Sequence, residues 1–249
     1  MSPHFEYLLR IADNSLILGQ RLAETCGHGP IIEEDIALTN IALDLIGQAR
    51  LLLSHAGRIE GRGRDEDQLA FLRAEHDFRN VTLVELPNGD FGRIVLRNLF
   101  VSAWQHDLWT ALLASTDRDL AAIAEKSLKE VRYHREHASD WTIRLGDGTA
   151  ESHGRMQSAL EMLWPYTREF FEPDVVDSAV AREGIGPEAG SLEAGWTANV
   201  RGVLDEAMLS VPDATPFLTR GKCGRHSEHL GHLLAPMQHL QRAYPGGTW

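Results

Sequence analysis

The chain has 249 residues, of which 43% are hydrophobic and 24% are charged, and its formal net charge is −12. These proportions are typical of a globular protein with a substantial core. The acidic balance argues against a protein that binds nucleic acid or an anionic membrane, because both partners require a basic face. We therefore expect neither kind of partner.

The cysteines and the N-terminal residues indicate the compartment. Cys26 and Cys223 are far apart and form no C-x-x-C motif, which suits a reducing environment. The first residues include Glu6 and Asp13 and lack a basic stretch before an apolar run, so they predict no signal or transit peptide. No stretch approaches the roughly 18 uninterrupted apolar residues of a membrane span. These patterns predict a cytoplasmic protein.

Helical periodicity dominates the chain, and strand alternation is nearly absent. We expect four long helices, over residues 5–26, 33–60, about 91–115, and from the end of STDRD (115–119) to about 145. The second is apolar nearly all round, so it should lie inside a bundle. Short segments join the first helix to the second and the third to the fourth, whereas about 30 residues separate the two pairs. Short, long, short connections predict an all-α, ferritin-like four-helix bundle with one crossover.

Shorter helices are expected after the bundle. A helix over residues 152–171 contains Pro165, which should kink or break it. The rest comprises a turn-rich stretch (172–191), a helix (192–211), a loop (212–224) and a last helix (225–244) interrupted near Pro236. There is no internal repeat or Gly/Ser-rich linker. We therefore expect one domain over residues 1–249, with the bundle at about 5–145 and accessory helices at about 150–249.

A di-iron site in such a bundle needs a carboxylate from each of two helices and a Glu-x-x-His motif from each of the other two. No Glu or Asp in this chain is followed by a His three residues later. The stretch SLKEVRYHREHASDW (127–141) places Glu130 four residues before His134, one position away from that motif. We expect Glu130 to pair with a basic neighbour such as Arg132 or Lys126 on the outside of the helix. His134 then remains as a lone imidazole, which is more often a structural histidine than a ligand.

The final segment contains His226, Glu228, His229, His232 and His239. On a helical wheel, His226 and His229 lie in or beside the leucine stripe, whereas His232 and His239 project the other way. One ion could not gather all four imidazoles. A mononuclear site of His226, Glu228 and His229 remains an alternative to a packed segment whose residues meet a partner.

Other chemistry finds little support in the sequence. There is no G-x-G-x-x-G, Walker or G-x-S-x-G motif, and GRGRDED follows a helix rather than a strand. Arg and Lys residues are too scattered to predict a pocket for a pyrophosphate. The sequence therefore predicts no assembled active site.

Five blocks carry a resemblance to a known family: YLLRIADNSLILGQRLAETCGHGP, DIALTNIALDLIGQAR, VELPNGDF, KEVRYHREHASDW and GKCGRHSEHLGHLLAPMQHLQR. Along its whole length the sequence resembles the C subunits (PaaC) of the bacterial phenylacetyl-CoA ring 1,2-epoxidases, also called phenylacetate-CoA oxygenases. The resemblance implies a ferritin-like fold. It also implies a non-catalytic, structural subunit of a multicomponent monooxygenase of aerobic phenylacetate catabolism.

In that family a related A subunit carries the di-iron site and binds the CoA thioester. A small B subunit helps to join the assembly, and a reductase with flavin and an iron–sulfur centre supplies electrons from NADPH. The resemblance implies that this chain holds no cofactor, pairs with the A subunit and meets the B and reductase subunits, and it leaves self-association of the isolated chain open. Carried across by position, Leu45, Gln48, Val131 and His134 occupy the lost ligand positions.

The interface with the A subunit is expected on the second and third helices, which have an excess of apolar residues. The terminal residues His226, Glu228 and His229 are a further interface candidate. Two other classes of function remain open. One is a ferritin-like oxygenase with an unusual metal site built from Glu130, His134 or the terminal histidines. The other is a stand-alone helical protein that binds an aromatic CoA ester.

Overall fold

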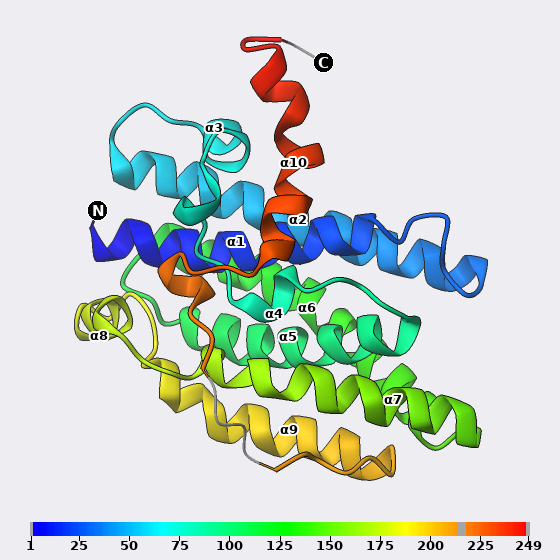
Figure 1. Ribbon diagram of the computed structural model, residues 1–249. Coiled ribbons are helices and arrows are strands. Elements are labelled where there is room, and N and C mark those ends of the chain that lie inside the picture. The colour runs from blue at the N-terminus through cyan, green and yellow to red at the C-terminus, as the bar shows by residue number, and fades with distance from the viewer. Residues whose placement is uncertain (1, 214–217, 248–249) are drawn as a thin grey trace. The chain divides into compact units, whose positions relative to one another are not determined.

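The computed structural model describes residues 2–213 and 218–247 (Figure 1). Within these residues all regular structure is helical, apart from one isolated bridge between Arg220 and Arg225. The all-α prediction is confirmed. The chain forms two compact units, Met1–Pro87 with Thr219–Trp249 and Asn88–Leu218, and each is described by itself. A single domain over residues 1–249 remains a prediction, and residues 214–217 of the loop expected at 212–224 lie outside the described residues.

The first unit is built on an antiparallel hairpin of α1 (Pro3–Ala23) and α2 (Ile32–Glu60), drawn in blue in Figure 1. Ser2 caps α1 by accepting the N–H of Phe5 at 3.2 Å. Gly61 ends α2 in the left-handed conformation, with φ 70°, which a glycine adopts without steric cost. Both helices begin and end close to the positions predicted from the sequence.

The long connection after α2 contains more structure than the one short helix expected. It forms α3 (Glu66–Phe71), a 3-10 turn η1 (Glu75–Asp77) and α4 (Thr82–Glu85). Asp65 and Gln68 form a capping box at the start of α3. This local pairing stabilises a helix that is too short to show a clear hydrophobic period.

A buried ion pair ties α1 to this connection. Asp13 and Arg73 are both buried, and Arg73 Nη1 lies 2.8 Å from Asp13 Oδ2 while Nη2 pairs with Oδ1. The same carboxylate accepts the main-chain N–H of Arg79 at 2.8 Å. The guanidinium also lies over the ring of Phe78, 4.2 Å from its centroid. Every oxygen of Asp13 therefore faces a donor from the connection.

The last helix, α10 (Glu228–Ala243), follows the 3-10 turn η4 (Gly221–Cys223) in the same unit. The predicted interruption near Pro236 is wrong, because α10 continues through that residue. Proline removes the N–H that would have bonded the carbonyl of His232. Both residues are exposed, so water can satisfy that carbonyl.

The second unit contains a second hairpin, α5 (Phe91–Leu112) and α6 (Arg118–Gly146), with shorter helices packed beside it. These are α7 (Ala150–Leu163), the 3-10 segment η2 (Trp164–Phe170), α8 (Val175–Arg182), the 3-10 turn η3 (Ala189–Leu192) and α9 (Glu193–Glu206). Pro165 ends the α-helical geometry, as predicted. Helix α8 was not expected in the turn-rich stretch; Asp174 and Asp177 start it with a capping box.

An aromatic cluster joins these shorter elements to α5. Trp104 stacks on Phe170 with ring centroids 4.9 Å apart. Trp196 of α9 donates its indole N–H to the carbonyl of Phe100 at 2.9 Å and lies 5.6 Å from the ring of Trp164. Aromatic packing thus links η2 and α9 to α5.

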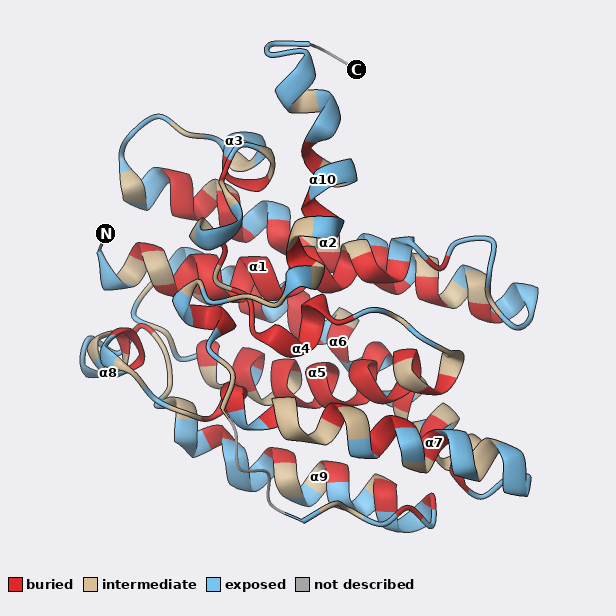
Figure 2. Ribbon diagram, in the orientation of Figure 1, coloured by how far each residue is buried: buried red, intermediate tan, exposed pale blue. Residues whose placement is uncertain are grey.

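The expectation that α2 lies wholly inside the protein is wrong. Figure 2 shows α5 buried along nearly its whole length, whereas α2 has an exposed side. Ile32, Ile36 and Leu43 are 71%, 55% and 62% exposed. The apolar composition of a helix indicates that its side chains avoid water. It does not show whether the same chain or another molecule covers those side chains.

By length and composition, α2 is also the one described helix that could cross a membrane. Its most apolar 18-residue window has a mean hydropathy of 1.4. Half of that window is buried by the rest of the chain. Core helices have the same composition, so this finding is weak evidence for a span.

Replacing Asp13 by Asn should lower the free energy of unfolding by about 3–5 kcal/mol, because Arg73 then stays buried without a counter-charge. Urea denaturation followed by circular dichroism measures the change. The matched control is Glu151→Gln, which removes the exposed ion pair with Arg155 and should cost less than about 1 kcal/mol. Equal losses in the two variants would contradict this role of Asp13.

Met208, just after α9, has φ 58° and is 68% exposed. A side chain in the left-handed region is strained, and glycine relieves that strain. Met208→Gly should therefore raise the free energy of unfolding by about 0.5–1 kcal/mol in urea denaturation. Met208→Ala, which keeps a Cβ, should give no such gain; a gain of the same size in both variants would attribute the effect to the lost methionine side chain.

Candidate functional site

The four positions predicted to have lost metal ligands are all buried. Leu45 and Gln48 lie one turn apart on α2, and Val131 and His134 lie one turn apart on α6. Each pair offers one aliphatic side chain and one amide or imidazole. A carboxylate-bridged di-iron centre needs carboxylates at such positions. The residues present do not fit that centre.

Glu130 interacts with a basic neighbour, as predicted from the sequence. Its carboxylate lies 3.4 Å from Lys126 Nζ, one turn earlier on α6. Lys126, rather than Arg132, is the partner. The alternative metal pair of Glu130 with His134 gains no support from this arrangement.

The terminal histidine His226 belongs to a buried ionic cluster in the first unit. Its side chain is 1% exposed, and that of Glu85 on α4 is fully buried at 0%. The Glu85 carboxylate lies 2.8 Å from His226 Nδ1, and it accepts from Asn80 Nδ2 at 2.9 Å and from the N–H of Ser227 at 2.6 Å. The other ring nitrogen of His226 lies 3.0 Å from the carbonyl oxygen of Phe78. We call these residues the Glu85 cluster.

This geometry fixes the charge on His226. Carboxylate and carbonyl oxygens only accept hydrogen bonds, so the form of His226 that satisfies both partners is the doubly protonated imidazolium, in which both ring nitrogens donate. Burial lowers the pKa of His226, but the hydrogen bond and charge of Glu85, the carbonyl of Phe78 and the charge of Asp13 together raise it above 6.5. The cluster therefore contains a buried imidazolium–carboxylate pair.

The three terminal residues do not assemble into a metal site. With both nitrogens protonated, His226 has no lone pair for an ion. The main-chain carbonyl of His229 accepts from Arg21 Nη2 at 3.1 Å, and Glu228 is exposed on the first turn of α10. The buried side chain of His226 offers no contact surface. A contact of Glu228 or His229 with a partner stays a prediction.

Sequence reasoning missed Glu85 and Asp13 as organising residues. Each is a single acid inside an apolar run, in VTLVELP and in RIADNSLIL. Such an acid is normally excluded from a core unless it is paired. That signal could have indicated buried charge, although it could not have named the partners.

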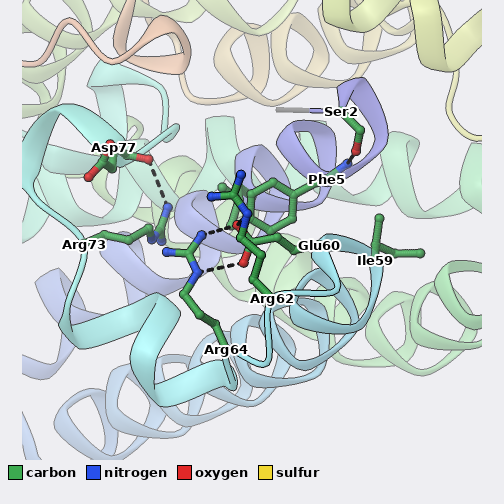
Figure 3. Close-up of a pocket in the computed structure, with 9 residues that line it drawn as sticks. Ser2, Phe5, Ile59, Glu60, Arg62, Arg64, Arg73 and Asp77 are labelled. Atoms are coloured by element: carbon green, nitrogen blue, oxygen red, sulfur yellow. Dashed lines mark hydrogen bonds and ion pairs between the residues drawn. The ribbon is translucent and has the colours of Figure 1, made fainter.

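A cleft of about 720 Å³ in the first unit gathers three arginines that look scattered in the sequence. Arg62, Arg64 and Arg73 line it together with Phe5, Leu9 and Ile59 (Figure 3). Glu60 accepts from Arg64 Nε at 2.7 Å and lies 4.0 Å from Arg62 Nε, while Arg73 is bound by Asp13. Asp77 supplies a further carboxylate. The cleft is balanced in charge, so it gives no support to a pyrophosphate pocket.

The arginines of this cleft control the ionisation of Glu60. The hydrogen bond from Arg64 lowers the pKa of Glu60 and outweighs the opposing effect of burial. The same bond raises the pKa of Arg64. Glu60 therefore remains ionised at neutral pH and cannot act as a general acid.

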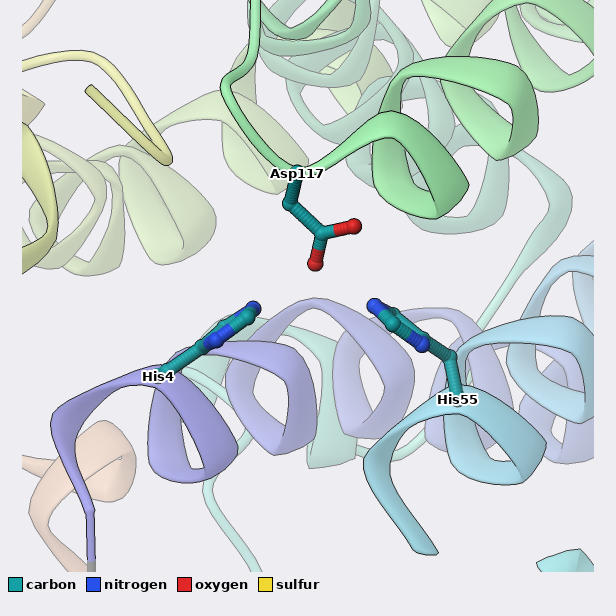
Figure 4. Close-up of side chains that lie close together, drawn as sticks. All are labelled: His4, His55 and Asp117. Atoms are coloured by element: carbon teal, nitrogen blue, oxygen red, sulfur yellow. The ribbon is translucent and has the colours of Figure 1, made fainter. Parts of the chain in front are cut away.

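His4 on α1 and His55 on α2 turn toward one another in the first unit (Figure 4). Their rings meet edge to face with centroids 6.0 Å apart. Arg58 Nη2 lies 3.2 Å from His55 Nδ1, and because a guanidinium only donates, Nδ1 carries a lone pair. Asp117, also drawn in Figure 4, caps α6 by accepting the N–H groups of Asp119 and Leu120.

Comparison with known proteins gives the family of the chain, which the geometry alone does not identify. Residues 1–249 match the PaaA/PaaC family, described as phenylacetic acid catabolic protein. This chain belongs to that family. Its ferritin-like, all-α fold agrees with the predicted fold class. A relative, the C subunit of the 1,2-phenylacetyl-CoA epoxidase of Escherichia coli (strain K12), is 49% identical over 243 residues, which cover 98% of each chain. The resemblance stated from the sequence blocks is confirmed.

The charge on His226 makes stability depend on pH. A raised pKa in the folded state stabilises the protein fully below the unfolded pKa of about 6.5, and this contribution is lost as pH rises through the folded pKa. The free energy of unfolding should therefore fall above about pH 6.5. His226→Gln should remove this dependence and lower stability at about pH 6 by roughly 3 kcal/mol.

Urea denaturation at a series of pH values measures both effects. His239→Gln, on the exposed side of the following helix α10, is the matched control and should follow the parent protein. A pH profile of His226→Gln that runs parallel to the parent profile would show that the imidazolium is not the titrating group.

Proposed function

We propose that this chain is the C subunit of a 1,2-phenylacetyl-CoA epoxidase, where it serves as a non-catalytic, structural partner of the di-iron A subunit in aerobic phenylacetate catabolism. The observation that carries the proposal is the 49% identity to the C subunit of such an epoxidase over 98% of both chains.

The residues at the candidate metal-ligand positions support a non-catalytic role. Leu45 and Val131 are aliphatic where bridging carboxylates would be needed, and Glu130 is engaged by Lys126. The buried His226 is already charged and bonded through both nitrogens. In the proposed complex the A subunit holds the di-iron centre and binds the CoA thioester. The reductase subunit, with flavin and an iron–sulfur centre, passes electrons from NADPH.

The structural role is supported by what α2 leaves uncovered. Its exposed isoleucines and leucine are apolar surface that a partner subunit would remove from water. The expected contribution of the third helix, α5, is not supported, because none of its large apolar side chains is exposed. We further propose that the complex, including its B subunit, works in the cytoplasm.

Elemental analysis tests the non-catalytic role. The chain purified alone should contain far less than one iron, whereas the complex co-expressed with the A subunit should contain about two irons per A subunit. Glu130→Gln in the complex should leave iron content and turnover unchanged. Two firmly held irons in the isolated chain would instead make it an oxygenase with its own metal site.

A calorimetric titration of the isolated chain with phenylacetyl-CoA tests the remaining alternative, a stand-alone protein that binds an aromatic CoA ester. No binding is expected, because the arginines of its cleft are neutralised by carboxylates. Micromolar binding would favour a stand-alone binding protein. A failure to co-purify with the A subunit under any condition would remove the proposed structural role.

A further inference from the structure

The exposed side of α2 carries an apolar stripe, interrupted by the exposed Asn40. Ile32, Ile36, Leu43, Gly47 and Leu51 are spaced four or seven residues apart, so they follow one side of the helix. Between residues 36 and 49 the only charged side chain is Asp44. The stripe is about 28 Å long at 1.5 Å per residue. We call it the α2 stripe.

Gly47 lies in the middle of this stripe, and no contact within the described part of the chain requires a glycine there. A Cβ built at Gly47 meets no atom within 4 Å. Glycine in the interior of a helix costs about 1 kcal/mol relative to alanine. Two other glycines of the first unit have a clear reason. At Gly19 a Cβ would lie 3.2 Å from the carbonyl oxygen of Ala42, and at Gly57 it would collide with that of Arg64.

A second helix packed closely across the stripe would explain both observations. Glycine lets two helix backbones approach, and apolar side chains one turn away on either side fill the flanking space. Leu43 and Leu51 hold those flanking positions, four residues before and after Gly47. With a width of about 10 Å, the stripe offers on the order of 300 Å². A standard interface buries about 800 Å² per partner, so the stripe would be its centre rather than its whole area.

The occupant follows from the family. This chain belongs to a family named for both PaaA and PaaC, and its relative is one of the lettered subunits of an epoxidase. Two chains of one family share their helices, so related apolar surfaces can meet around an approximate two-fold axis. We infer that the α2 stripe, centred on Gly47, docks a helix of the A subunit at close approach. This inference rests on the proposed function and adds the surface through which it acts.

The test is a competition for a limiting amount of tagged A subunit. Parent and variant chains carry different tags and are co-expressed with it, and the captured ratio reports their relative affinity. The captured amount of Gly47→Trp should be at least about 30-fold lower than that of the parent, as expected for a side chain at the centre of an interface. The parent should also displace Leu43→Arg from the A subunit, although position 43 is 62% exposed in the isolated chain.

Two controls separate docking from folding. Gly202→Trp on α9 has the same open space, with no atom within 4 Å of a Cβ, and should compete equally with the parent. Gly47→Ala should raise the Tm of the isolated chain by about 2–4 °C, because it removes the cost of a helical glycine without a clash. If Gly47→Ala raises the Tm of the isolated chain and still competes as well as Gly202→Trp, a helix does not cross closely at Gly47.

The outcomes distinguish this inference from the proposed function. If the parent chain is not captured by the A subunit, the proposed function fails. If the parent is captured and Gly47→Trp and Leu43→Arg compete equally with it, the function stands and the surface assignment is overturned. Self-association or binding to lipid vesicles that both variants abolish, with capture unchanged, would assign the stripe to a second copy or to a membrane and would also overturn it.

Discussion

Charge buried in the connection after α2 is the constraint on which the first unit depends. This connection contributes Arg73 and Glu85, and neither side chain can remain in a core without a partner of opposite charge. Helix α1 supplies Asp13, and the segment after residue 219 supplies His226. A connection made of short elements is thereby held at two points, by one partner that precedes it in the sequence and one that follows it.

The two units reach stability by different means. In the first, ion pairs and main-chain hydrogen bonds fix the short elements in addition to the apolar side chains that these elements bury, such as Leu69, Phe78 and Leu83. Arg21 illustrates this, since it bonds the main-chain carbonyls of Glu85 and His229 and so joins α1 to both α4 and α10. In the second, aromatic rings on α5, η2 and α9 pack together beside buried aliphatic side chains, and one indole N–H bonds the main chain of α5. Buried charge specifies geometry sharply, whereas aromatic packing tolerates small shifts.

The long helices could be predicted closely because their hydrophobic period extends over many turns. The largest discrepancies are at C-terminal ends, such as Ala23 against residue 26 for α1. Short helices such as α8 escaped prediction because capping rather than periodicity defines them. The missing Glu-x-x-His pairs were visible in the sequence, since that motif is local. The pair of Glu85 with His226 was not, because 141 residues separate them and no local pattern relates them.

The exposed side of α2 shows a different limit. Its apolar composition was read correctly, but composition cannot say which molecule provides the cover. Only exposure in the folded chain distinguishes Leu43, which faces outward, from Leu45, which faces inward. The open space at Gly47 is likewise invisible in the sequence, where Gly19 and Gly47 look alike.

The first unit is assembled from both ends of the chain, and this has a consequence for how the protein is made. The second unit is complete in sequence once Leu218 has been synthesised, so it can close while translation continues. The first unit must wait, because His226 and α10 follow the whole of the second unit in the sequence. Until then Glu85 lacks its buried cation. In a nascent chain the first unit therefore stays incomplete until the second unit has been made, although its N-terminal hairpin is synthesised first.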